Sequence, residues 1–575
     1  MKRFLAALAG LLAIAHAIPD SGHPSLQPLA DTVTVILPLA TVVGSVTDVE
    51  SFNGIPFAEP PLDQLRLRPP KRLSRPVGIV DATGTAPDCP QMPRSIDNET
   101  TRLLERTAPE IFEVFKFQQG EEIQGQEDCL TVSVQRPKGT QATDKLPVLF
   151  YIFGGAFEFG GTASNNPEAF VRFAQSQNQS FIFVGVNYRL AGFGFMGGAE
   201  ILKDGSANLG LLDQRMGLEW VADNIAFFGG DPDKVTIYGH SAGSISVFDQ
   251  TALFGGNATY KGKPLFHGAM MSGGSVLATE PVDSPKAQAI YDNVVDIVGC
   301  NQTADTLDCL RHAPFKDLYH AINTAGRVNS YAFLALPYLP RPDGQVLTQS
   351  PDVLAKEGKY HAVPVIIGDQ EDEGTIFSLT QTDVNSSDRL VDYFAKYFFH
   401  RASREQVAGL VGTYPTDSAA GSPFRTGDLN EYYQLYCKGN GFKRLAALSG
   451  DITFTLTRRL AIEAMDESNP NVPIWSYLGS SSYGVPYLGS FHGSEILLLF
   501  SGIGPAAQSS RTHYLNFIHN QDPNIGVQQS QQWPRWTKDT RQLLWIKRQS
   551  NDLTRDDFRN ESYAFIKDNI KALYY

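Results

Sequence analysis

The stretch Lys234-Val-Thr-Ile-Tyr-Gly-His-Ser-Ala-Gly243 decides the fold of this chain. Residues 235–238 are β-branched or aromatic and predict a buried strand, and residues 244–253 are predicted to form a helix directly after it. Between them stands Gly-x-Ser-x-Gly, with its serine at position 241. This pattern is typical of a sharp strand-to-helix turn that exposes the serine hydroxyl, and its glycines are needed because the neighbouring strand and helix leave no room for a Cβ atom. The stretch predicts that Ser241 is a nucleophile; an ordinary strand–helix turn is the alternative.

The same alternation of strands and helices continues on both sides of this turn. Further strands are predicted within residues 31–49 and over 146–153, 181–187 and 363–367, and a helix is predicted over 211–228. Such alternation favours an α/β fold in which a large, mostly parallel sheet carries helices on both faces. Although 575 residues could hold three domains, no repeat or linker divides them, so we expect one large domain.

Composition excludes several classes of protein. Apolar residues make up 42% of the chain and charged residues 19%, which is typical of a globular protein and not of a disordered or collagen-like one. The net charge of −13 offers no broad basic face for a phosphate backbone, so we expect no nucleic-acid partner.

The first residues predict the compartment. Lys2 and Arg3 precede an apolar run over residues 4–15, and Ala15-His16-Ala17 follows as a small-x-small cleavage pattern. We therefore predict a signal peptide over residues 1–17, a mature domain over 18–575 and a secreted protein. No later run of 18 apolar residues predicts a transmembrane segment. Six Asn-x-Ser/Thr sequons agree with a secretory route and predict a glycoprotein: Asn98, Asn178, Asn257, Asn301, Asn385 and Asn560.

A serine nucleophile needs a base, an acid that orients the base, and donors for an oxyanion. Gly154-Gly155-Ala156 follows a predicted strand, and its N–H groups could turn towards Ser241, where the N–H of Ala242 supplies another donor. The acid is expected after the strand 363–367. Four carboxylates stand there, Asp369, Glu371, Asp372 and Glu373, and spacing does not choose among them; we expect at least two to be solvated loop charges.

The base is expected beyond that acid, which leaves four histidines: His400, His492, His513 and His519. His492 lies in a loop of small residues that leads into an apolar helix, where an imidazole can project into a site. The other three lie in helix-like stretches and are interpreted as structural or surface residues. Residue patterns alone therefore favour His492.

At this point the sequence resembles the type-B carboxylesterase/lipase family, the cholinesterase-like branch of the α/β-hydrolases, and within it the fungal lipases that carry a lid. The resemblance runs from about residue 33 to the C-terminus. It rests on five segments: Ser51-Phe-Asn-Gly-Ile-Pro-Phe-Ala-Glu-Pro-Pro61, Glu127-Asp-Cys-Leu-Thr-Val-Ser-Val134, Asp213-Gln-Arg215, Phe228-Gly-Gly-Asp-Pro232 and Leu339-Pro-Arg-Pro-Asp-Gly344.

The resemblance implies an α/β-hydrolase fold and a set of roles. Ser241 would be the nucleophile, Glu373 the acid and His492 the base, with Gly155, Ala156 and Ala242 as the oxyanion hole. No metal or organic cofactor is implied. Cys89–Cys129 and Cys300–Cys309 would be disulfides, the first closing a lid over residues 89–129, and Cys437 would remain unpaired.

Two positions depart from the family's pattern. His240 stands where the family usually has a glutamate, which puts the hydrogen bonding and the pH profile of the site in question; we interpret His240 as structural. Ala156 replaces a common glycine, which matters little because the donor is a backbone N–H.

The substrate follows less directly. Apolar residues recur at roughly helical spacing between positions 103 and 117, so the lid could open an apolar face on a lipid surface; a helix packed permanently on the core is the alternative. All five tryptophans lie outside this segment, which disfavours a choline-binding site. We therefore expect a lipase acting at a lipid–water interface on long-chain acyl glycerides and sterol esters, as a monomer or weak dimer. The alternatives are a carboxylesterase on short soluble esters, a peptidase on the same scaffold and a non-catalytic binding protein.

Overall fold

A computed structural model of the chain describes residues 31–93, 123–325, 330–431, 441–528 and 531–575. Four sequence-based predictions fall wholly or partly outside these ranges: the signal peptide 1–17, residues 94–122 of the predicted lid, the sequon at Asn98, and Cys437.

One large sheet organises the unit from Thr32 to Tyr575. Its spatial order is β1-β2-β3-β5-β7-β6-β8-β11-β12-β13-β14-β15, with β4 beside β2. Its strands are β1 (Thr32–Ile36), β2 (Ala40–Val46), β3 (Val49–Pro56), β4 (Gly78–Asp81), β5 (Thr131–Pro137), β6 (Leu146–Ile152), β7 (Ile182–Val186), β8 (Gly230–His240), β11 (Gly268–Ser272), β12 (Val365–Gln370), β13 (Ile474–Ser480), β14 (Gln542–Lys547) and β15 (Asn551–Arg555). The strands from β7 to β14 in this order pair in parallel, and antiparallel pairs lie at both ends. The predicted mostly parallel sheet is confirmed.

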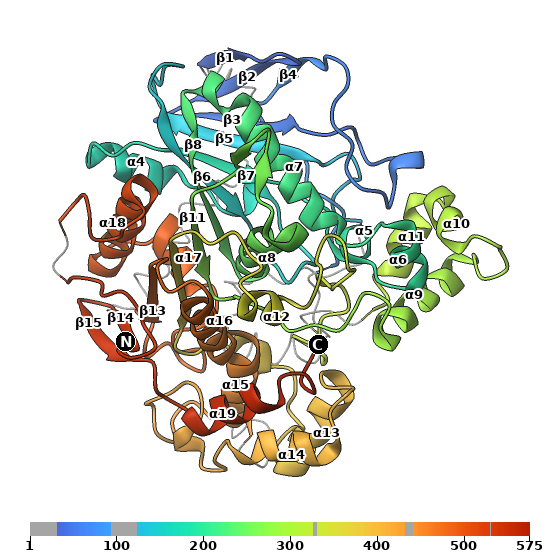
Figure 1. Cartoon of the computed structure of the whole chain (residues 1–575), viewed down its shortest axis with the longest axis vertical. Coiled ribbons are helices and arrows are strands. Elements are labelled where there is room, and N and C mark those ends of the chain that lie inside the picture. Colours follow the sequence, from blue (N-terminus) through green and yellow to red (C-terminus); the bar gives the residue numbers. More distant parts are fainter. Residues whose placement is uncertain (1–30, 94–122, 326–329, 432–440, 529–530) are drawn as a thin grey trace, which may run out of the picture. The chain divides into compact units, whose positions relative to one another are not determined.

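Helices cover both faces of this sheet (Figure 1). Two neighbouring residues of β6 contact helices on opposite faces of the sheet, because successive strand residues point to opposite sides. Phe150 faces α7 (Leu209–Asn224), where a Cβ atom on Gly217 would lie 3.3 Å from its ring. Tyr151 faces α17 (Ser494–Phe500), with its ring centroid 5.6 Å from that of Phe500. Beside α7 packs α8 (Ala242–Gly256), and beside α17 pack α4 (Glu168–Ser176) and α18 (Pro505–Asn520).

The remaining helices surround this core. They are α5 (Ala191–Phe195), α6 (Ala199–Asp204), α9 (Pro285–Val298), α10 (Thr306–His312), α11 (Phe315–Ile322), α12 (Pro351–Lys356), α13 (Ser387–Tyr397), α14 (Arg404–Gly412), α15 (Phe442–Gly450), α16 (Leu456–Ser468) and α19 (Asn560–Asn569). Among the described residues, no helix is both long and apolar enough to cross a bilayer.

The elements predicted around the deciding stretch are present with small shifts of their ends. The strand predicted over 146–153 is β6, and the strand predicted over 363–367 is β12, which runs on to Gln370. The helix predicted over 244–253 is the regular part of α8, whose backbone leaves helical geometry from Leu253 onwards.

Both predicted disulfides are confirmed. Cys89 pairs with Cys129 and Cys300 with Cys309, at Cα–Cα distances of 5.0 and 5.8 Å. The first joins the two ends of the predicted lid segment, whose described parts are residues 89–93 and 123–129.

Candidate active site

Ser241 lies at a strained turn between β8 and α8. Its φ of +57° and ψ of −126° belong to a region that a serine rarely adopts, and such strain persists only where the surrounding structure enforces it. A Cβ atom on Gly239 would lie 2.1 Å from the carbonyl oxygen of Gly243, and one on Gly243 would lie 2.0 Å from that of Ile152. These distances are shorter than any tolerated contact, so both glycines are required, as the sequence predicted.

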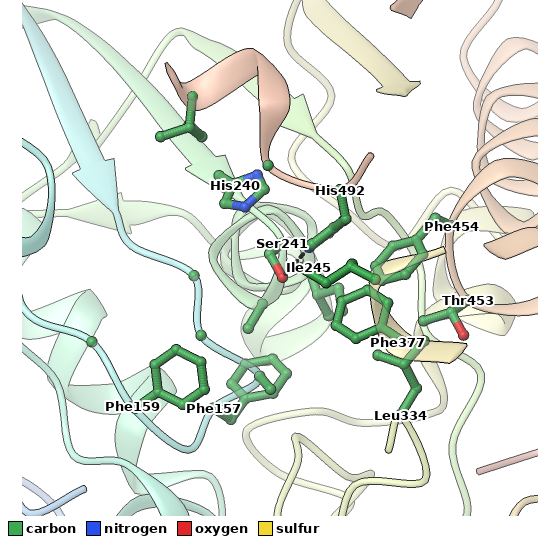
Figure 2. A pocket seen from close by; sticks show the side chains of 18 of the residues that line it. Phe157, Phe159, His240, Ser241, Ile245, Leu334, Phe377, Thr453, Phe454 and His492 are labelled. Atoms are coloured by element: carbon green, nitrogen blue, oxygen red, sulfur yellow. Dashed lines mark hydrogen bonds between the residues drawn. The ribbon is translucent and has the colours of Figure 1, made fainter. Parts of the chain in front are cut away.

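His492 contacts Ser241 directly. Its Nε2 lies 2.8 Å from the Ser241 Oγ, and its Nδ1 is bonded to Oε2 of Glu373. The other carboxylate oxygen of Glu373 accepts the backbone N–H of Gln370 at 2.6 Å, which fixes the carboxylate at the end of β12. The structure thus brings together Ser241, His492 and Glu373, the set that the family resemblance implied, and Figure 2 shows His492 beside Ser241.

Burial shifts the pKa values of His492 and Glu373. Removal from water lowers the pKa of His492, and the neighbouring His240 lowers it further. Burial raises the pKa of Glu373, and the charge of Glu495 adds to that rise. The imidazole is therefore neutral, and a neutral imidazole is the form that can accept a proton from a serine hydroxyl.

The four carboxylates of the 369–373 run are all buried, so the expectation that at least two are solvated loop charges is wrong. Asp369 and Asp372 are fully buried, and Glu373 and Glu371 expose only 2% and 9% of their surface. The physical reason is that the run ends a central strand, β12, and folds back into the protein instead of crossing its surface.

Each of the other three carboxylates has its own partner. Asp369 accepts from Arg458 at 2.8 Å, and Glu371 accepts from Arg425 at 2.6 Å. Asp372 accepts from the hydroxyl of Ser422 and the backbone N–H groups of Phe424 and Ser490, at 2.8, 2.8 and 2.9 Å. Glu373 is the member of the run that contacts an imidazole.

The other candidate histidines have partners elsewhere. His513 is buried with Nδ1 3.1 Å from the carbonyl oxygen of Pro523, and Nε2 of His519 lies 3.0 Å from the carbonyl oxygen of Gln179. His400 lines a separate cavity beside α9. The contacts of His513 and His519 are those of structural residues, and none of the three histidines lines the pocket of Ser241.

The glycine-rich loop after β6 lies against the serine turn. A Cβ atom on Gly154 would lie 2.5 Å from the carbonyl oxygen of His240, so this loop and the turn approach as closely as their backbones allow. Gly155 has a φ of +120° and Ala156 a φ of +58°. Both line the same pocket as Ser241 and Ala242.

This pocket has a volume of about 340 Å³ and a mostly apolar lining. Its apolar side chains are Phe157, Phe159, Ile245, Leu277, Leu334, Leu336, Ile376, Phe377, Phe454, Phe491, Ile496 and Leu497. Figure 2 shows Phe377 and Phe454 beside His492, with ring centroids 5.1 and 4.5 Å from that of the imidazole. All five tryptophans are described, and none of them lines this pocket. Among the described residues, no group of three His, Cys, Asp or Glu side chains is placed to hold a metal ion.

Sequence reasoning missed Glu495, the second carboxylate of this region. Its Oε1 lies 2.7 Å from Nδ1 of His240, and the ring of His240 lies 4.8 Å from that of His492, centroid to centroid. The available clue was its position three residues after His492, at the start of an apolar helix, where it follows Gly-Ser in the same loop.

The chain matches known proteins over most of its length. A model of the carboxylesterase family matches residues 32–566. The secreted triacylglycerol lipase LIP1 of Gibberella zeae is 54% identical over 96% of this chain and 92% of its own length. Secreted lipase 1 of Botryotinia fuckeliana is 48% identical over the full length of both. The crystal structure of EstA from Aspergillus niger superposes with a TM-score of 0.76 over 95% of this chain and 99% of its own; at 23% identity it shows a shared fold.

Proposed function

The chain belongs to the carboxylesterase family and is a carboxylic ester hydrolase, and from that premise we propose that it is a secreted lipase that uses Ser241, His492 and Glu373 as its catalytic triad. The observation that carries the roles is the continuous contact from Ser241 through His492 to Glu373. Secretion is supported by two relatives that are named as secreted lipases and by the predicted signal peptide.

The mechanism follows from these contacts. His492 takes the proton of the Ser241 hydroxyl as the oxygen attacks the ester carbonyl, while Glu373 holds the imidazole in orientation and stabilises its charged form. The same imidazole protonates the departing alcohol. A water molecule then enters, gives its proton to His492 and hydrolyses the acyl-enzyme, which frees Ser241.

We assign the oxyanion hole to the backbone N–H groups of Gly155, Ala156 and Ala242. All three residues line the pocket beside Ser241, and Ala242 begins the helix that follows it. Backbone donors that are fixed before the reaction stabilise the tetrahedral oxyanion without reorganising, and loss of one such donor costs about 10²–10³-fold in turnover.

The lining of the pocket supports a long acyl chain as substrate. Its walls are built from phenylalanine, leucine and isoleucine side chains, and it has no tryptophan face for a quaternary ammonium group. Two relatives are named as lipases. For this chain we propose long-chain acyl glycerides, and hydrolysis of sterol esters stays a prediction.

The base of the lid segment is joined to the loop that carries the proposed oxyanion residues. Gln91 exchanges two hydrogen bonds with Gly160, at 3.2 and 3.1 Å, and the N–H of Met92 donates to the carbonyl oxygen of Glu158 at 2.8 Å. The Cys89–Cys129 disulfide holds this base closed. The described ends of the lid segment are therefore tied to the loop of the site, and a lid that responds to a lipid surface stays a prediction.

Most of the described sequons lie at the surface. Asn178, Asn257, Asn301 and Asn560 are exposed, and Asn385 is half-buried. We propose that the exposed four carry glycans, as a secreted chain with surface sequons would.

One experiment separates the lipase from a carboxylesterase that prefers short soluble esters. The rate of hydrolysis of a short-chain triglyceride is measured at concentrations below and above its solubility limit. A jump in rate above the limit is expected for the lipase. Smooth saturation below the limit would contradict a lid that opens at a lipid surface. Ser241→Ala should abolish hydrolysis and labelling by a fluorophosphonate probe, while Ser176→Ala, an exposed serine on α4, should keep both. Retained hydrolysis by Ser241→Ala would overturn the assignment of the nucleophile.

A further inference from the structure

Two imidazole–carboxylate pairs lie side by side in this site. One is the proposed catalytic pair of His492 and Glu373, and the other joins Nδ1 of His240 to Oε1 of Glu495 at 2.7 Å. The two imidazole rings are 4.8 Å apart between centroids and are tilted by 37°. Figure 2 shows His240 and His492 on either side of the Ser241 hydroxyl.

The second pair is held in place by close backbone contacts. A Cβ atom on Gly154 would lie 3.2 Å from Cδ2 of His240, and one on Gly493 would lie 3.5 Å from its Nε2. The ring therefore fits between the glycine-rich loop and the loop that carries His492. The side chains of His240 and Glu495 expose only 14% and 11% of their surface.

The chain connectivity makes this pair a tie between two parts of the site. His240 directly precedes Ser241 on the turn, and Glu495 follows His492 by three residues at the start of α17. The hydrogen bond between His240 and Glu495 therefore fixes the loop of the base against the turn of the nucleophile.

We propose that His240 and Glu495 act as one charge-neutral pair that positions the His492 imidazole and sets the pH range in which it accepts the Ser241 proton. The proposal rests on the triad proposed above. Both members are positioning residues, since they act through His492.

The charges around this pair can be named. Besides the two carboxylates, Glu495 and Glu373, and the two imidazoles, the titratable groups that face it are tyrosines on four elements: Tyr151 on β6, Tyr238 on β8, Tyr477 on β13 and Tyr514 on α18. Burial raises the pKa of all four tyrosines, that of Tyr514 to about 12, so they are uncharged at any working pH.

The sign of the effect follows from these charges. A charge on His240 disfavours a positive charge on His492, while the carboxylate of Glu495 favours it, so the two members of the pair act on the pKa of His492 in opposite directions. Removal of His240 alone leaves Glu495 uncompensated, which raises the pKa of His492. Removal of Glu495 alone takes away the carboxylate that favours a charged His492, which lowers that pKa.

The test uses three variants of the full-length enzyme and a soluble p-nitrophenyl ester, with kcat/KM measured against pH. In His240→Gln we expect the acidic limb of the profile to move to higher pH by about one unit. In Glu495→Gln we expect it to move to lower pH, and in the double variant to return towards the wild-type position, because that site is again neutral. His519→Gln, a half-buried histidine bonded to Gln179, is the matched control and should leave the limb unmoved.

A purely structural role would give losses of rate that add up in the double variant and an acidic limb that stays in place. An unmoved limb in His240→Gln, or a double variant that does not return, would overturn the proposal. If His240→Gln does not fold, an unmoved limb in Glu495→Gln overturns it. The pH dependence of fluorophosphonate labelling gives a second reading that does not need turnover.

Failure of this inference is distinguishable from failure of the proposed function. If Ser241→Ala is inactive while the acidic limb does not respond to His240→Gln, only the role of the second pair fails. If Ser241→Ala remains active, the triad itself is wrong.

Discussion

The run from Asp369 to Glu373 supplies carboxylates to two regions of the protein. One is the proposed active site, and the other is a cluster of buried arginines in the core. Glu373 contacts the imidazole of His492 on the wall of the pocket. Asp369 contacts Arg458 in the core, where Asp556 accepts two further hydrogen bonds from the same guanidinium, both at 2.8 Å. All of these carboxylates are buried, so burial alone does not mark a catalytic group.

The difference between the regions lies in the partner. An imidazole with a lowered pKa can take a proton and return it, which suits a reaction that moves protons. A buried guanidinium keeps its charge, and the carboxylates around Arg458 raise its pKa further. We therefore expect the first region to be sensitive in activity and the second in stability.

The largest effect expected from this comparison is the loss of activity in Glu373→Gln. The amide can no longer stabilise the charged imidazole or hold its tautomer, and an equivalent change in a serine triad lowers kcat by about 10⁴-fold. The free energy of unfolding should change little, since an oxygen of the amide can still accept the N–H of Gln370. Steady-state assays on a soluble ester measure the loss of kcat.

The control for Glu373→Gln is Glu371→Gln in the same run. Glu371 is bonded to Arg425 and to Ser480, not to the imidazole, so kcat should stay within a few-fold of the wild type. Equal losses of kcat in the two variants would mean that residues 369–373 act as one structural unit. The claim that only Glu373 of this run serves catalysis would then be wrong.

The next effect in size is a loss of stability in Asp556→Asn. This carboxylate also accepts from Nε of Arg459 at 2.9 Å, so its removal leaves two buried guanidinium groups short of a counter-charge. Breaking such a buried pair costs about 3–5 kcal/mol in the free energy of unfolding. Urea unfolding measures the cost, and kcat at 25 °C should remain near that of the wild type.

The matched control is Asp552→Asn, an exposed carboxylate on β15 that pairs with Lys547. We expect a much smaller loss, because water and salt screen exposed pairs. A folded Asp556→Asn variant with normal stability but low kcat would show that the core cluster serves catalysis, which is the reverse of our interpretation.

Much of the fold and part of the site could be predicted from the sequence because the patterns involved are local. The β-branched run of β8 and the glycines around Ser241 fix a strand, a turn and a helix within twenty residues. His492 could be favoured because a loop of small residues leaves room for an imidazole.

The choice of the acid and the partner of His240 depend on contacts between distant segments. An isolated bridge pairs Asp372 with Phe491, and it is this register that puts Glu373 beside His492. Neither spacing nor composition encodes such a register, so four carboxylates remained open and Glu495 was missed. The resemblance to the family pointed to Glu373, but it did not point to the carboxylate that pairs with His240.

The last effect we predict is on the pH dependence of stability, and it separates the two ends of the 369–373 run. Burial raises the pKa of Asp369 from its ordinary value of 3.8 to about 8. A carboxyl whose pKa is higher in the folded state contributes a stability that is complete below pH 4 and is lost as the pH rises towards 8, because the unfolded chain ionises first. Asp369→Asn has no proton to lose, so its free energy of unfolding should improve relative to the wild type between pH 5 and pH 8, by at most about 1.4 kcal/mol per pH unit. Urea unfolding at pH 5 and pH 8 measures the free energy of unfolding of both proteins. If the difference between Asp369→Asn and the wild type is the same at both pH values, Asp369 is ionised throughout and serves as a permanent counter-charge to Arg458.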